Sequence, residues 1–253
     1  MKRIITLVIS LSFGHFNYAQ SGKIIYDVKQ NMEVIFGGEV EVKNLPDGMA
    51  EMFSEPQNFS KELLFHDGVS LYRDKKGEEM EDLNYSSDDG SIEIRIFQEE
   101  VPEILYVDHH SSKIIHQKGI MGKPFVIKDS FENLPWKITS EKVKFLNYEC
   151  IKATYEEDDK LIVAWFTPEI APYLGPSKYH SLPGTILLLN INDGETEFKA
   201  REIIKDDFSS EINAPKKGKK VSQKEYDEIK LEKEKEMREQ MGNMEKRIEI
   251  DNH

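Results

Sequence analysis

Hydrophobic and polar residues alternate over many short stretches between residues 23 and 204, which is the pattern of half-buried β-strands. In residues 23–30, for example, Ile24, Tyr26 and Val28 would share one face of a strand. The other stretches expected to form strands are residues 33–42, 63–65, 69–72, 92–96, 104–107, 113–116, 125–128, 136–139, 145–155, 161–167, 185–189 and 196–204. Short strands with no long helix between them to carry a crossover favour antiparallel pairing.

The pattern changes near the C-terminus, where helix-forming residues replace the alternation. Ser222 and Glu225 have the spacing of a capping box, in which each side chain accepts a backbone N–H at the start of a helix. A helix is therefore predicted over residues 223–248, with Glu234 and Arg238 spaced to pair. Its thin apolar stripe consists of Tyr226, Ile229, Met237, Met241, Met244 and Ile248. A solvated helix that leans on the sheet fits this stripe, and so does a helix that docks on a partner through soft methionine side chains.

These patterns predict a mainly β (α+β) fold in which a curved antiparallel sheet or a partly open barrel is followed by a C-terminal helix. The expected units are a β domain over residues 20–213, a basic linker over 214–221 and the charged helix over 222–253. His66-Asp67-Gly68 and Asn192-Asp193-Gly194 predict hairpin turns. Residues 51–59 and the acidic residues 74–90 are expected to form loops.

Residues 173–190, YLGPSKYHSLPGTILLLN, combine two turn signals with a strongly apolar strand. Gly175-Pro176 marks the first turn, because proline fixes one φ angle and glycine permits unusual ones. Leu182-Pro183-Gly184 predicts a type II turn with Gly184 at positive φ. Residues 185–189 have no polar alternation and predict a strand buried on both faces, at the centre of the fold.

The order and spacing of several motifs resemble those of the GLPGLI family, a set of exported bacterial proteins. The family's six-residue signature aligns with residues 181–186, SLPGTI, and departs from it at Ser181 and Thr185. The other matching motifs are Trp136-Lys137-Ile138, Glu141, residues 147–153, Ala164-Trp165-Phe166-Thr167, Glu169-Ile170, Gly175-Pro176 and Leu182-Pro183-Gly184. The resemblance covers about residues 100 to 205 and implies no activity or catalytic residues, because none is agreed for the family.

The N-terminus has the pattern of a signal peptide over residues 1–19. Lys2 and Arg3 precede an apolar run over residues 4–13, and small or polar residues lead to a cleavage point after Ala19. The run is shorter than the roughly 20 residues that a membrane-spanning helix needs. The sequence therefore predicts an exported protein, periplasmic or secreted in a Gram-negative cell envelope, with no transmembrane segment in the mature chain.

The composition, with 38% hydrophobic residues, is that of a folded domain. The net charge of −13 disfavours binding to nucleic acid, because an acidic surface repels phosphates. The single cysteine, Cys150, leaves no internal disulfide and is expected to be a small buried hydrophobic residue rather than a thiol paired with His180.

The sequence contains no motif for a catalytic serine, a zinc protease, a phosphate loop or a dinucleotide, so no catalytic residue and no cofactor are predicted. Asp108-His109-His110 with His116 has metal-ligand character, but neighbouring strand residues point to opposite faces, and exposed histidines of a hairpin are the preferred interpretation. Residues 156–159, EEDD, are interpreted as a solvated hairpin turn rather than a calcium loop. No metal site is predicted.

Three classes of function remain. The preferred hypothesis is a non-enzymatic interaction module that docks on an outer-membrane or periplasmic assembly through the C-terminal helix. The alternative is a periplasmic carrier whose sheet holds an apolar or amphipathic ligand, for which Trp136, Trp165, Tyr179 and Leu187 are the candidate binding residues. The third hypothesis is an enzyme without a recognisable motif.

Overall fold

The structure, a computed structural model, describes residues 21–31, 55–77, 83–86, 93–96, 101–130, 133–171 and 173–251. The expected signal peptide over residues 1–19 and the expected strand over residues 33–42 lie outside these ranges.

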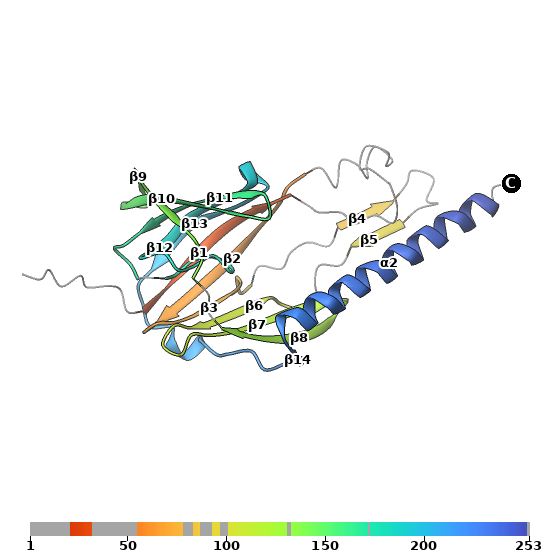
Figure 1. Cartoon of the computed structure of the whole chain (residues 1–253), viewed down its shortest axis with the longest axis horizontal. Coiled ribbons are helices and arrows are strands. Elements are labelled where there is room, and N and C mark those ends of the chain that lie inside the picture. The colour runs from red at the N-terminus through yellow and green to blue at the C-terminus, as the bar shows by residue number, and fades with distance from the viewer. Residues whose placement is uncertain are drawn as a thin grey trace, which may run out of the picture.

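Twelve strands form one curved sheet in the order β14-β8-β7-β6-β3-β2-β1-β13-β12-β11-β10-β9 (Figure 1). The strands are β1 Ser21–Gln30, β2 Gln57–His66, β3 Val69–Asp74, β6 Ile104–Asp108, β7 Lys113–Ile120, β8 Lys123–Ser130, β9 Lys137–Phe145, β10 Tyr148–Glu157, β11 Lys160–Thr167, β12 Thr185–Ile191, β13 Thr196–Ile204 and β14 Lys219–Val221. Every pairing in this sheet is antiparallel except that of β14 with β8. Two further strands, β4 Leu83–Ser86 and β5 Glu93–Ile96, pair with each other. The predicted fold class is confirmed.

Strand β1 lies between β2 and β13, although β1 and β13 are at opposite ends of the β domain in the sequence. Lys23 is opposite Ile204, and a bulge between Ile25 and Tyr26 shifts the register of this pairing. Ile24, Ile25 and Tyr26 are all buried, so the centre of β1 is covered on both faces. The strand therefore joins the two halves of the sheet.

The hairpin turns are built from residues with positive φ. In the predicted hairpin between β2 and β3, Asp67 has φ 41° and Gly68 has φ 72°. Residues with positive φ at both central positions match the right-handed twist of the flanking strands. Leu146 (φ 47°) and Asn147 (φ 67°) form a similar turn between β9 and β10, so the single strand expected over residues 145–155 was wrong. That turn contains no glycine, which is why the sequence pattern did not reveal it.

Three segments expected to lack regular structure contain strands. Residues 57–59 of the first expected loop extend β2, and β4 lies within the acidic stretch 74–90. Within the expected linker over 214–221, Lys219–Val221 forms β14, and its backbone pairs with Phe125–Ile127 of β8. Hydrogen bonding to an existing strand outweighs the polar composition of these segments.

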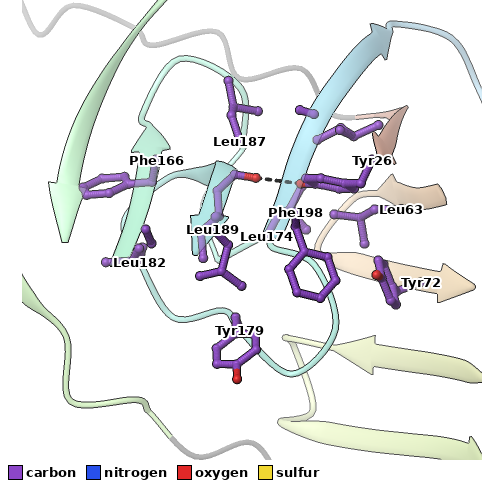
Figure 2. Close-up of a cluster of buried hydrophobic side chains, with 14 of the residues drawn as sticks. Tyr26, Leu63, Tyr72, Phe166, Leu174, Tyr179, Leu182, Leu187, Leu189 and Phe198 are labelled. Carbon is purple, nitrogen blue, oxygen red and sulfur yellow. Dashed lines mark hydrogen bonds between the residues drawn. The ribbon is translucent and has the colours of Figure 1, made fainter. Parts of the chain in front are cut away.

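The segment between β11 and β12 packs on the inner face of the sheet, meaning the face that carries the main core cluster. Its residues Ile170, Leu174, Tyr179 and Leu182 are buried in the main core cluster together with side chains from eight strands of the sheet. Figure 2 shows Leu174, Tyr179 and Leu182 around β12, with the Tyr26 hydroxyl donating a 2.6 Å hydrogen bond to the backbone oxygen of Ile186. The core is therefore built around this segment and β12, as the apolar run predicted.

The two glycines of this segment are required for close packing and not for positive φ. Gly184 does not have positive φ, so the predicted type II turn was wrong. The Gly184 N–H donates to the backbone oxygen of Leu182 at 2.7 Å, which makes a three-residue turn centred on Pro183. A Cβ atom at Gly184 would overlap the backbone oxygen of Thr167, and one at Gly175 would overlap that of Tyr179. In this segment positive φ occurs instead at Tyr173 (63°), Ser177 (52°) and Ser181 (76°).

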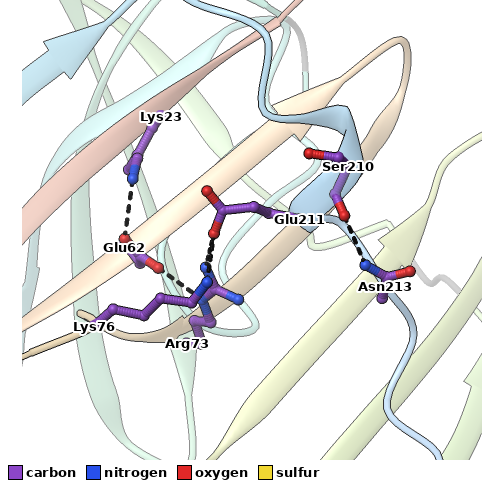
Figure 3. A network of polar contacts seen from close by, with 7 residues as sticks. All are labelled: Lys23, Glu62, Arg73, Lys76, Ser210, Glu211 and Asn213. Atoms are coloured by element: carbon purple, nitrogen blue, oxygen red, sulfur yellow. Dashed lines mark hydrogen bonds and ion pairs between the residues drawn. The ribbon is translucent and has the colours of Figure 1, made fainter.

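A chain of ion pairs holds the segment after β13 against β1, β2 and β3 (Figure 3). The buried Glu62 carboxylate accepts from Arg73 at 2.6 Å and faces the Lys23 ammonium at 3.4 Å. Arg73 also donates to Glu211 in the 3-10 turn η3, Ser209–Glu211, at 2.6 Å, and Lys76 pairs with the same carboxylate at 2.7 Å. These lysine and arginine hydrogen bonds lower the pKa of Glu211 to about 2.

The helix α2, Gln223–Asp251, starts beside β8 and projects beyond the sheet (Figure 1). Its capping box is confirmed: the Glu225 N–H donates to the Ser222 hydroxyl at 3.2 Å, and the Ser222 N–H donates to the Glu225 carboxylate at 2.7 Å. The side chains of Met237, Met241, Met244, Ile248 and Arg238 lie outside the described part of the helix, so the predicted stripe and the predicted pair with Glu234 stay predictions. Among the described residues, no helix combines the length and the hydropathy needed to cross a membrane.

Candidate functional site

A groove of 660 Å³ runs between α2 and the inner face of the sheet. The inner face changes from apolar to charged as the strands approach this groove. On β2, Leu63 is followed on the same face by Lys61, and on the β6 side Leu105 is preceded by Glu103. The groove is lined by Gln30, Gln57, Phe59, Lys61, Asp74, Val101, Glu103, Lys118, Gly119, Ile120, Met121, Tyr226, Asp227, Lys230, Lys233 and Glu234.

The floor of the groove is a buried ionic cluster. The Lys61 ammonium lies 2.6 Å from a carboxylate oxygen of Asp74 and 3.8 Å from one of Glu103, and Lys61 is only 8% exposed. The Nε2 atom of His116 lies 2.8 Å from the other oxygen of Glu103. A buried charge is tolerated only when it is paired and hydrogen-bonded, and these contacts meet that condition. The floor thus sets one lysine against two carboxylates, and the nearby charge of Lys118 also acts on Glu103.

The protonation of the cluster follows from its burial and charges. Burial alone would raise the pKa of Glu103, but the hydrogen bond from His116 and the charges of His116, Lys61 and Lys118 outweigh it and bring this pKa to about 2. Burial lowers the pKa of His116 below its ordinary 6.5, against the opposing effect of Glu103. Glu103 is therefore ionised near neutral pH, with the Lys61 ammonium 3.8 Å from its carboxylate.

The low pKa of Glu103 predicts an acid-dependent loss of stability. A carboxyl group whose folded pKa is depressed stabilises the protein above its unfolded pKa, and this contribution disappears as the pH falls through the folded pKa. For Glu103 the window runs from pH 4.5, the ordinary value, down to about 2. We expect the difference in unfolding free energy between the wild type and Glu103→Gln to shrink across this window, measured by urea unfolding at several pH values. A constant difference from pH 6 to pH 2 would contradict the pairing of Glu103.

The first turns of α2 form one wall of the groove and are fixed to β8 by a small second core. Its buried members are Phe125, Ile127, Val221 and Tyr226, with Ile120 and Ile229 packed against them. The rings of Phe125 and Tyr226 meet edge to face with centroids 5.7 Å apart. The Tyr226 hydroxyl donates to the backbone oxygen of Gly119 at 3.1 Å. The first turns of the helix are therefore held on β8 by these contacts.

Replacing Tyr226 by phenylalanine is expected to loosen this wall. The variant keeps the ring contact but loses the hydrogen bond to Gly119, which contributes about 1 kcal/mol. Amide hydrogen exchange should accelerate in the first turns of α2 about fivefold, with little change in β1 and β12. Tyr173→Phe, at an exposed tyrosine, serves as the matched control and should leave the exchange of α2 unchanged.

One lining lysine, Lys118, makes no direct ion pair with the described residues, although its charge acts on Glu103. Among the described residues, the ammonium of Lys118 makes no ion pair within 4.0 Å, and it lies 5.9 Å from the centroid of the Tyr226 ring. Met121, three residues further on in the β7–β8 turn, also lines the groove and is 54% exposed. The groove thus presents a positive charge and an exposed apolar side chain.

The structure does not bring the four candidate ligand-binding residues together in one cavity. Trp136 packs edge to face on Tyr155, with ring centroids 4.7 Å apart, and donates to the backbone oxygen of His180 at 2.8 Å. Trp165 alternates with the buried Ala164 and Phe166 along β11 and so lies on the opposite face. Leu187 is fully buried in the main core.

Tyr179, the fourth candidate, is buried in the core and borders a hollow of 290 Å³ at one end of the sheet. That hollow is lined mainly by polar residues such as Glu157, Lys178 and Glu195. A second hollow, where Leu63, Tyr72 and Leu105 of the core meet His109 and His180, measures only 10 Å³, enough for about one water molecule.

The histidines considered as metal ligands, and Asp108 beside them, have structural partners nearby. Nε2 of His110 lies 2.6 Å from the backbone oxygen of Asp67, and Asp108 accepts hydrogen bonds from the N–H and the hydroxyl of Ser111. His116 faces Glu103. Within the described ranges, no group of three His, Cys, Asp or Glu side chains is placed to hold a metal ion.

Cys150 is buried, and burial raises the pKa of its thiol to about 11, with a smaller effect from the charge of Glu169. The thiol is therefore protonated near neutral pH, as expected of a small buried residue. Asp158 and Asp159, both with positive φ, form the predicted hairpin turn, while Glu156 and Glu157 are the last residues of β10.

The sequence pattern did not identify the groove. The sequence feature that could have revealed the groove is a charged residue at a core-facing position of a strand. Examples are Lys61, two residues before Leu63, and His116, two residues after Ile114. Recognising that feature requires the strand register, which the sequence pattern alone left open.

Comparisons with known proteins agree with the fold. A family model described as "Protein of unknown function (Porph_ging)" matches residues 155–188, from the end of β10 to β12. No curated protein matches the sequence. Two crystal structures of PNGF-II, in space groups P21 and C2, are similar with TM-scores of 0.54 and 0.55 and sequence identities of 16% and 14%. Each match covers 85% of this chain but only 34% and 33% of the PNGF-II chain, so this chain spans about a third of that protein.

Proposed function

We propose that this protein is a non-enzymatic interaction module of a Gram-negative cell envelope, and that a protein of an outer-membrane or periplasmic assembly docks in the groove between α2 and the sheet. The observation that carries the proposal is the contrast between a filled apolar core and an open groove of 660 Å³. A concave site of this size, bounded by a helix and a sheet, is suited to a partner.

The filled core argues against the alternative, a carrier of an apolar ligand. Such a carrier needs a mostly apolar cavity of several hundred Å³. The hollow beside Leu63 and Tyr72 is 10 Å³, and the candidate residue Leu187 is buried in packed core. The larger groove is lined mainly by polar and charged side chains. An apolar ligand would have to displace water from these charges, which is costly.

The chemistry of the groove also favours binding over catalysis. A general base works best with a pKa near the operating pH, whereas the pKa of Glu103 is about 2. Lys61 and His116 both face this carboxylate and so stabilise its charge. We therefore assign the cluster a structural role and propose no catalytic residue and no cofactor.

The proposal places the chain in the GLPGLI family and outside the cytoplasm. The supporting observation is that residues 181–186, SLPGTI, lie inside the segment matched by the family model of unknown function. Cell fractionation followed by mass spectrometry of the N-terminus tests the export. A chain that begins at Gln20 in the envelope fraction is the expected result, and an uncleaved chain confined to the cytoplasm would overturn it.

Site-specific photocrosslinking in the native cell tests the docking. A photoreactive residue in place of Met121, at the rim of the groove, is expected to give a crosslinked protein band that is absent when the same residue replaces Leu161. Both side chains are exposed, at 54% and 42%, so they differ mainly in position. Equal bands at both positions, or none at Met121, would contradict docking in the groove.

A further inference from the structure

We infer that the groove binds an extended peptide segment of the partner, which presents an acidic side chain to Lys118 and an apolar side chain to Met121. This inference rests on the proposed docking function and specifies the chemistry of the partner.

The first step is to identify which lysines of the groove already have an ion-pair partner. Lys61 is neutralised by Asp74 and Glu103, at 2.6 and 3.8 Å. On the helix wall, Lys230 lies 3.6 Å from Glu234, and Lys233 lies 2.5 Å from Glu236. Lys118 remains as the lining lysine without a carboxylate within 4.0 Å in the described part of the chain. The lining as a whole holds four lysines and four carboxylates, so an acidic side chain of a partner would add a direct ion pair for Lys118 and not a missing net charge.

The second step is the position of Lys118. Its side chain is half-buried, and its ammonium lies 5.9 Å from the centroid of the Tyr226 ring, which is itself held by Gly119. The aromatic ring and the strand restrict the lysine, so less side-chain entropy is lost when it pairs. A partly buried ion pair is also screened less by salt than one on an open surface.

The third step is the apolar surface in the same groove as Lys118. Met121 is 54% exposed, and Ile120 and Phe59 also line the groove. An unbranched methionine adapts to side chains of different shape, which suits a contact with a peptide. An acidic residue followed closely by an aliphatic or aromatic one would therefore occupy both features.

The fourth step distinguishes a peptide from a lipid. The groove is lined by charges of both signs, including Asp227 and Glu234 on the helix. A fatty chain would leave those charges without water or partners, whereas the backbone and polar side chains of a peptide can form hydrogen bonds with them. A peptide is therefore the occupant that fits.

Selection from a display library of random ten-residue peptides tests the inference with the purified protein. The wild type is expected to enrich peptides that combine Asp or Glu with a neighbouring apolar residue. Lys118→Glu should lose this preference and enrich Lys or Arg at the same place. Lys113→Glu is the matched control, because Lys113 lies exposed at the opposite end of the same strand, and it should reproduce the wild-type selection.

A selected peptide then allows a quantitative check. Lys118→Gln should weaken its affinity at least tenfold, Lys113→Gln less than twofold, and the peptide should shift the NMR signal of the Met121 methyl group. Thermal unfolding of each variant verifies that it is folded. The same peptide preference in the wild type and Lys118→Glu would overturn the inference, and so would a bound peptide that leaves Met121 unchanged.

The failure of this inference differs from the failure of the proposed function. If no peptide is enriched while the photoreactive residue at position 121 still crosslinks in cells, the peptide inference is wrong and the groove binds a folded surface. If a peptide binds but no crosslink forms in cells, docking in the cell envelope is wrong although the groove has the inferred chemistry.

Discussion

Replacing Gly175 by alanine is expected to destabilise the protein by about 3 kcal/mol, at the upper end of the usual cost of overpacking a core. The added Cβ atom would overlap the backbone oxygen of Tyr179 and approach the Ile186 side chain to 2.9 Å. Both neighbours belong to the packed centre of the fold, so neither has space to move. In thermal unfolding the melting temperature should fall by roughly 10 °C for a chain of this size.

Gly77→Ala is the control that separates this steric effect from backbone strain. Gly77 has φ +82°, yet no atom of the described residues lies within 4 Å of the position of its Cβ. Its replacement should cost only the left-handed conformation, about 1 kcal/mol. Gly184→Val is expected to resemble Gly175→Ala, because its Cβ would overlap the Thr167 backbone oxygen. If both core glycine variants melted with the wild type, the close packing around Pro176 and Pro183 would be disproved.

Replacing Arg73 by methionine is the second substitution with a large expected effect, also about 3 kcal/mol. The Glu62 side chain is only 3% exposed and would keep a single partner, Lys23, at 3.4 Å. Removing one member of a buried ion pair leaves an uncompensated charge, which typically costs 3 to 5 kcal/mol, and the remaining lysine reduces this cost. Urea unfolding should show the loss as a lower midpoint.

The double variant Glu62→Met/Arg73→Met provides the internal comparison. Because it removes both buried charges, it should recover most of the stability lost in the single variant. Arg201→Met is an external control, since Arg201 and its partner Asp27 are 44% and 49% exposed and contribute less than about 1 kcal/mol. A single variant as stable as the wild type would show that the network in Figure 3 does not hold this region.

The fold was predictable where the local pattern determines it. Alternation revealed β1, β11 and β13, the absence of alternation revealed β12 as a buried strand, and Ser222 with Glu225 marked the start of α2. The order of the strands was not predictable, because β1 pairs with β13 through register and core packing between distant segments. The prediction of positive φ at Gly184 was wrong for the same reason. The oxygen that leaves no space for a side chain at Gly184 belongs to Thr167, at the end of β11.

The candidate site was less predictable than the fold. Aromatic and aliphatic residues such as Trp136 and Leu187 suggested an apolar cavity, but these side chains pack against other core residues. The groove depends instead on the position of α2, which the small second core around Tyr226 fixes on β8. No local sequence pattern determines where a helix lies relative to a sheet. The sequence therefore could not predict that Lys61, Glu103 and Lys118 line one groove.

The central position of β1 has a consequence for folding kinetics. Its side chain Tyr26 bonds to Ile186, 160 residues further along the chain, and its second neighbour strand ends at Ile204. Bringing such distant segments together costs loop entropy before any contact offsets it, so proteins of this topology fold in milliseconds to seconds. While the chain folds, one edge of β1 stays open to pairing with other chains until β13 has joined it. The partly folded chain is therefore most prone to aggregate before β13 is in place.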